Sequence, residues 1–184
     1  PNVKFTFTVL NDDIVNAFAL PGGYVYISRG LLGLANTEAE LAGVLGHEIG
    51  HVTARHSAQR YSSSVVAQGL SVGASILGSL ILGTSEVGQA VGQGSAVYLQ
   101  SFSREHEFEA DTLGVRYLAR AGYATDAMAS FLASLQAFSP LESKVSGRPD
   151  LAARTNIMST HPRTQDRVVA ATRAANVRPV RDPK

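Results

Sequence analysis

The sequence predicts an α+β fold that is mainly helical, with a small antiparallel sheet packed on a central helix and further helices. Residues 3–28 contain short stretches of alternating apolar and polar residues, which are typical of strands. From residue 37 onward, apolar residues recur at three- and four-residue spacing, which indicates helices. Strands followed by helices favour an α+β architecture in which the helices cover the sheet.

The length and composition narrow the class of protein. At 184 residues the chain is long enough for one domain and short for two, so we expect a single domain over 1–175 and a flexible tail over 176–184. A net charge of +1 with 17% charged residues argues against a nucleic-acid partner. The sequence contains no cysteine, which leaves His, Asp and Glu as candidate metal ligands.

Three strands are expected near the N-terminus. Residues 3–9 (VKFTFTV) alternate, and residues 14–28 (IVNAFALPGGYVYIS) read as two strands separated by Pro21-Gly22-Gly23. A helix is then expected over 36–60, where Thr37 and Glu40 fit a capping box.

The 36–60 helix carries an H-E-x-x-H motif in which each position has a chemical task. His47 and His51 are four residues apart and therefore share one helix face, where both rings can bind one zinc ion at about 2.0–2.1 Å. Glu48 lies beside the metal and can take a proton from an attacking water. Gly46 and Gly50 each cost the helix roughly 1 kcal/mol, which is explained if another backbone approaches closely.

Catalytic zinc requires a third protein ligand. His56 is five residues after His51, about 140° around the helix, and Ala54 stands where a helix-breaking glycine would be needed. We therefore expect His56 to be a solvated or packing residue. The other candidates lie in residues 103–111 (SREHEFEAD), where the pairs Glu105 with Glu109 and Glu107 with Asp111 each share a face. Periodicity does not decide between the pairs, and a solvated acidic face is the alternative for most of these residues.

Helices are also expected over 101–123, ending at Gly122, over 125–138, and over 161–176 with Pro162 at the first turn. Residues 139–150 (SPLESKVSGRPD) are expected to form a long loop. The run from 61 to 100 contains no charge before Glu86 and is rich in Gly, Ser and Ala. Four interpretations stay open for it: a helical flap that covers a cleft, contact with a membrane surface through 65–83, packing of a helical hairpin, and a transmembrane span.

Four ordered motifs together resemble the gluzincin zinc metalloproteases, the family of the HtpX and BepA proteases and the CAAX prenyl endopeptidases. They are residues 16–32 (NAFALPGGYVYISRGLL), 46–52 (GHEIGHV), 103–111 and 159–167 (STHPRTQDR), and the resemblance spans about 11 to 174. It implies a minimal gluzincin protease core with one zinc ion per chain.

The resemblance also implies residue roles. Glu107 is the first Glu of the family's E-x-x-x-D pattern and would be the third zinc ligand, and Asp111 would accept the second ring N–H of a ligand histidine. Arg104 matches an arginine with a structural ion-pair role. Asn16 and Ala17 match an edge strand that binds the backbone of an extended substrate, although an ordinary buried strand is the alternative.

His161 matches an HP motif near the active site, and Arg167 matches the arginine that follows it. Two roles are open for His161: donating to the oxyanion, or occupying the open position on zinc at rest. We predict the second, because an unfolded-chain protease that is always active endangers its neighbours. His161 should then lie within bonding distance of the zinc.

These observations predict a zinc endopeptidase that acts on extended or unfolded polypeptides in cell-envelope protein quality control. The branch of the family that it resembles implies a periplasmic or lipid-anchored enzyme. Two alternatives stay open: a chaperone-like binder of unfolded chains with a weakly active site, and a latent protease that a partner opens. The sequence does not predict an oligomeric state.

Overall fold

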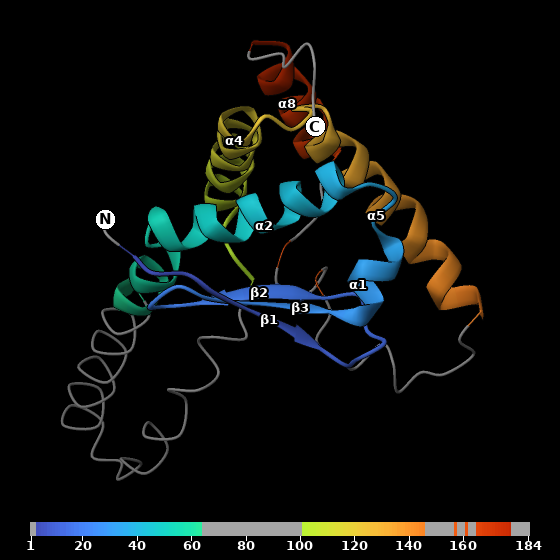
Figure 1. The fold of residues 1–184 in the computed structure, drawn as a ribbon, viewed down its shortest axis with the longest axis horizontal. Helices are drawn as coiled ribbons and strands as arrows, with labels where there is room; N and C mark the ends of the chain where they lie inside the picture. Colours follow the sequence, from blue (N-terminus) through green and yellow to red (C-terminus); the bar gives the residue numbers. More distant parts are fainter. Residues whose placement is uncertain (1–2, 64–100, 146–156, 158–160, 162–164, 178–184) are drawn as a thin grey trace, which may run out of the picture.

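A computed structural model describes residues 3–63, 101–145, 157, 161 and 165–177 (Figure 1). Its elements are, in chain order, β1 (Thr6–Leu10), β2 (Ala17–Leu20), β3 (Tyr24–Ser28), α1 (Arg29–Leu34), α2 (Glu38–Thr53), α4 (Arg104–Ala121), α5 (Ala127–Val145) and α8 (Gln165–Val177). The fold is mainly helical with a small sheet, as predicted. The segment 65–83 and Pro162 lie outside the described residues. Among the helices that are described, none is long and apolar enough to cross a membrane.

The sheet has three strands in the order β1-β3-β2. β2 and β3 form the predicted antiparallel hairpin, with Ala17 opposite Ile27. β1 pairs with β3 in parallel, with Thr6 opposite Tyr24, so the prediction of a purely antiparallel sheet was wrong. The physical reason is that the chain reverses direction twice between β1 and β3, and strands separated by two reversals run the same way when they become neighbours.

Helix α2 lies between the sheet and helices α4 and α8 (Figure 1). One side of α2 contacts β2 and β3, and other sides contact α4 and α5. The main apolar core fills the space between the sheet, α1, α2 and α5; its buried members are Val15, Ala17, Ile27, Leu31, Val44, Phe131, Leu135 and Ile157. The helix that carries H-E-x-x-H is therefore held on several sides.

The two helices α2 and α4 approach closely through the glycines that precede the histidines. A methyl group added at Gly50 would lie 3.1 Å from the carbonyl oxygen of Ala110, and one at Gly46 would lie 3.2 Å from Cα of Gly114. Both distances are tighter than ordinary van der Waals contact, so alanine would push the backbones apart. The expectation that a second backbone passes these glycines is confirmed.

The start of α2 follows the prediction, but its end does not. The hydroxyl of Thr37 accepts the backbone N–H of Glu40, whose carboxylate accepts the backbone N–H of Asn36. The helix ends at Thr53 instead of continuing to residue 60, because Arg55 takes a left-handed φ of 59°. This conformation costs a non-glycine residue roughly 1–2 kcal/mol, and no glycine in the sequence signalled it. The chain is helical again from His56 to residue 63.

The C-terminal helices also differ from their predicted bounds. Helix α4 ends at the left-handed Gly122, as predicted. Helix α5 continues to Val145, so the part of the predicted loop from 139 to 145 is helical. A single proline at 140 removes only one backbone hydrogen bond, and the Leu, Glu and Lys residues after it favour a helix. Helix α8 ends at Val177, two residues into the predicted tail.

Candidate metal centre

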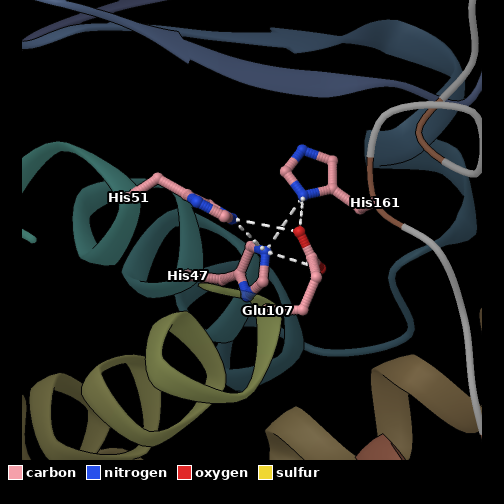
Figure 2. Close-up of side chains that lie close together, drawn as sticks. All are labelled: His47, His51, Glu107 and His161. Carbon is pink, nitrogen blue, oxygen red and sulfur yellow. Dashed lines mark hydrogen bonds and ion pairs between the residues drawn. The ribbon is translucent and has the colours of Figure 1, made fainter. Parts of the chain in front are cut away.

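Four buried side chains from three parts of the chain point toward one another (Figure 2). His47 and His51 come from α2, Glu107 comes from the first turn of α4, and His161 lies between α5 and α8. Each offers one nitrogen or oxygen atom, and these four atoms all lie within 4.8 Å of one another. The structure thus brings together three predicted ligands and the predicted latch residue, although they are up to 114 positions apart in the sequence.

The distances among these atoms suit a small cation with tetrahedral ligands. Nε2 of His47 lies 3.0 Å from Nε2 of His51 and 3.2 Å from Nδ1 of His161. Oε1 of Glu107 lies 3.4 Å from Nε2 of His51 and 2.9 Å from Nδ1 of His161. Ligand atoms at about 2.0–2.1 Å around a tetrahedral zinc ion are about 3.3 Å apart, so the donor set fits such an ion.

Asp111 orients His47. Its Oδ1 lies 2.9 Å from Nδ1 of His47, one helical turn beyond Glu107. A carboxylate only accepts hydrogen bonds, so the proton of a neutral His47 is on Nδ1 and Nε2 is free to bind a metal. In this position Asp111 can accept the second ring N–H of His47, which is the role that the resemblance predicts for it.

Arg167 of α8 supports both acidic side chains. Its guanidinium donates to the two oxygens of Asp111 at 2.8 and 2.7 Å, and its Nη1 lies 2.6 Å from Oε2 of Glu107. The arginine is buried. The sequence showed only that Arg167 matches a family position; its two carboxylate partners could not be predicted, because they lie on another helix. Arg104 instead pairs with Asp166 at the surface.

The charge states of Asp111, Glu107 and His51 favour cation binding. Burial raises the pKa of Asp111, but hydrogen bonds from Arg167 and His47 outweigh burial and hold this pKa below its usual value. Burial also raises the pKa of Glu107, and the neighbouring His161 and His51 lower it overall. The pKa of His51 is lowered, mainly by burial. At neutral pH the site therefore holds two carboxylates and a neutral His51, which are forms that bind metal.

Glu48 lies beside the group of His47, His51, Glu107 and His161, here called the ligand group, and does not belong to it. Its side chain is buried, and Oε1 lies 3.5 Å from Nε2 of His161. No hydrogen bond from the described residues reaches this oxygen. A buried carboxylate oxygen with unused acceptor capacity next to a metal site is suited to take a proton from water.

Of the two expectations for His56, a solvated or a packing residue, the structure shows the packing residue. It is fully buried, and its Nδ1 lies 2.9 Å from Nδ1 of His51. Its Nε2 lies 3.2 Å from Oε2 of Glu109. The assumption of a continuous helix through His56 was wrong, because the turn at Arg55 brings His56 behind His51. The only sequence signal for this contact was the presence of a third histidine, His56, five residues after His51.

Ala17 is the first residue of β2 and Asn16 directly precedes it. Strand β2 is an edge strand of the described sheet and contacts α2. Ala17 is fully buried. The backbone carbonyl of the preceding residue, Asn16, accepts a hydrogen bond from the backbone N–H of Ser28. An apolar pocket opens near Glu48 and His161; its apolar lining consists of Val44, Met128, Phe131, Leu132, Leu135 and Ile157.

Two histidines of an H-E-x-x-H helix joined by a glutamate from a later helix define a metalloprotease of the gluzincin type. The sequence pattern of peptidase family M48 matches residues 1–175, and the chain belongs to this family. The prediction that the chain belongs to a metalloprotease family is confirmed.

Similar proteins occur in bacteria and in mitochondria. The chain is 35% identical over 179 residues to the beta-barrel assembly-enhancing protease of Escherichia coli (strain K12), which covers 94% of this chain and 34% of that protein. It is 40% identical over 122 residues to the mitochondrial metalloendopeptidase OMA1 of Arabidopsis thaliana. This match covers 66% of this chain and 24% of that protein. The chain thus spans about a third of the length of the bacterial relative.

Proposed function

We propose that this chain is a zinc endopeptidase that cleaves extended or unfolded polypeptides. The observation that carries the proposal is the convergence of metal-binding atoms from His47, His51 and Glu107, with the buried carboxylate of Glu48 beside them. One zinc ion per chain would be held by these three residues, with Asp111 orienting His47.

The chemistry divides between the metal and the protein. A bound zinc ion supplies Lewis acidity, which polarises the scissile carbonyl and lowers the pKa of the attacking water. Glu48 takes the proton of that water and passes it to the leaving amine. Burial keeps Glu48 away from competing solvent, and the α2 backbone fixes its position relative to the two histidines.

Edge strand β2 supports the choice of an extended substrate. A strand at the edge of a sheet binds another extended chain through main-chain hydrogen bonds, which do not depend on the substrate sequence. Asn16 and Ala17 would contact the substrate backbone on this edge in a conformation that exposes Ala17, which is buried here. The apolar pocket between α2 and α5 would accept an apolar substrate side chain, which is a kind of side chain that unfolded polypeptides expose.

His161 is proposed as a latch that keeps the resting enzyme quiet. Its Nδ1 is directed at the ligand group, 2.9 Å from Glu107 and 3.2 Å from His47, and its Nε2 faces Glu48 at 3.5 Å. The ring of His161 would then fill the fourth ligand position on the metal through Nδ1. Its Nε2 would at the same time pair with the carboxylate of the general base, Glu48. The competing role requires an N–H that is available to the oxyanion, whereas in this conformation Nδ1 faces Glu107 and His47 and Nε2 faces Glu48.

The setting is proposed from the relatives. The similarity to a beta-barrel assembly-enhancing protease supports a role in protein quality control in the bacterial periplasm or cell envelope, with a lipid anchor as one means of attachment.

The test is a digest of casein by the zinc-loaded chain with Glu48→Gln as the control. We expect wild type to cleave and the variant to lose about 10²–10⁴-fold in rate while retaining zinc. Cleavage that survives in Glu48→Gln contradicts the proposed mechanism. Equal binding of unfolded polypeptide by both proteins without cleavage, even after His161→Ala, favours the chaperone-like alternative.

A further inference from the structure

The two ring nitrogens of His51 have different neighbours. Nε2 faces the ligand group, 3.0 Å from Nε2 of His47 and 3.4 Å from Oε1 of Glu107. Nδ1 lies on the other side of the ring, 2.9 Å from Nδ1 of His56. A neutral imidazole carries one proton, on one of its two nitrogens. The partner of Nδ1 therefore decides whether Nε2 is free to bind a metal.

Glu109 determines which way the hydrogen bonds run. Its Oε2 lies 3.2 Å from Nε2 of His56, and an ionised carboxylate only accepts. The Nε2 atom of His56 must then carry the proton, which leaves its Nδ1 as an acceptor. His51 must consequently donate from Nδ1 and present a bare Nε2 to the ligand group. The opposite order would place a proton on Nε2 of His51 and prevent ligation.

We propose that His56 and Glu109 are positioning residues that hold His51 in the one tautomer able to bind the metal. The proposal rests on the proposed ligand role of His51 and adds a chain, Glu109 to His56 to His51, that the ligand assignment alone does not contain. This chain would do for His51 what Asp111 does for His47 by direct contact, which is to keep the proton on Nδ1. Each histidine ligand is thus oriented by a carboxylate, one directly and one through a second imidazole.

The surroundings hold the rings of this chain in place. His106 stacks on His56 with centroids 4.3 Å apart and planes at 19°, and its Nε2 lies 3.0 Å from Oε1 of Gln59. Phe102 stacks on His51 at 3.9 Å. The left-handed Arg55 turns the backbone so that His56 reaches the back of His51. Residues with a strained backbone conformation, such as Arg55, cluster at functional sites, which supports a functional role for the contact between His56 and His51.

The first experiment measures zinc affinity by competition with a chromophoric chelator. His56→Leu keeps the side-chain volume but removes the acceptor, and we expect a loss of about 10–100-fold. His56→Asn can place its amide oxygen near the former Nδ1 and accept from His51, so it should bind zinc more tightly than His56→Leu. Glu109→Gln should lose less than His56→Leu, because the side chain of Glu109 is 58% exposed. Glu105→Gln, an exposed change on the same helix, should match wild type.

The second experiment reads the tautomers directly. Long-range ¹H–¹⁵N spectra of the zinc-loaded chain should show His56 with its proton on Nε2 and a bare Nδ1. In Glu109→Gln the amide group can donate or accept, so the Nε2–H form of His56 should no longer be enforced. These spectra do not depend on proteolysis, and a purely structural role of His56 would not specify the tautomer.

Several results would overturn the proposal. Wild-type zinc affinity in a folded His56→Leu, together with loss of zinc in His51→Ala, would refute the positioning role and leave the ligand assignment standing. Full zinc in His51→Ala would refute the ligand assignment and the positioning role with it. If His56→Leu does not fold, a proton on Nδ1 of His56 in the wild-type spectrum refutes the proposal equally well.

Discussion

Nδ1 of His47 donates to Oδ1 of Asp111 across 2.9 Å, and Arg167 donates to both oxygens of the same carboxylate. Three elements, α2, α4 and α8, meet in this one contact. The carboxylate is therefore held in one direction by two partners, and we predict that it determines which nitrogen of His47 faces the site.

Asp111→Asn should weaken zinc binding about 10–100-fold, because an amide can donate as well as accept and no longer requires the proton on Nδ1 of His47. Chelator competition on the purified chain measures the loss. Asp126→Asn, an exposed change of the same chemistry, should leave the affinity unchanged. Equal affinities in the two variants would show that Asp111 does not orient the ligand.

Glu107→Ala should lower the zinc content as severely as His51→Ala, because each removes one of three ligands. Glu105→Ala, two residues earlier on the exposed side of α4, is the matched control and should retain zinc. Metal analysis of the purified variants decides the outcome. A full complement of zinc in Glu107→Ala would refute its assignment as the third ligand.

His161→Ala should keep or raise the rate of casein cleavage, because three ligands stay in place and Glu48 loses the ring that faces it. The rate is compared with that of wild type at equal zinc content. A fall of roughly 10²–10³-fold would instead identify His161 as an oxyanion donor.

Arg167→Met should lower the free energy of unfolding of the metal-free chain by about 3–5 kcal/mol, because it leaves buried carboxylates without their cation. Urea denaturation followed by circular dichroism gives this value. Arg173→Met is the control, since Arg173 is exposed on the same helix and should change stability by well under 1 kcal/mol. Similar losses in the two variants would mean that the buried ion pairs of Arg167 contribute little.

Local patterns predicted the features that depend on neighbouring residues. The alternation of 14–28 and the turn at 21–23 predicted the hairpin, and the cap at Thr37 predicted the start of α2. The spacing of His47 and His51 on one helix face was sufficient to predict that they converge. These features follow from the geometry of a single strand or helix, which the sequence states directly.

Contacts between distant segments could not be read from such patterns. The pairs Glu105 with Glu109 and Glu107 with Asp111 fit a helix face equally well, and only the approach of α4 to Gly46 and Gly50 turns Glu107 toward the histidines. The parallel pairing of β1 likewise depends on which edge of the hairpin it joins.

The sequence by itself determined the motif and most element types, and it predicted His47, His51 and Glu107 as ligands from a family pattern. The tertiary structure decided that His56 lies behind His51, that Arg167 holds Asp111 and Glu107, and that His161 faces the metal centre. The physical reason is that a periodic pattern specifies which side chains share a face. Which faces meet is settled by packing among elements far apart in the chain, and at Arg55 by a backbone turn that no residue type announces.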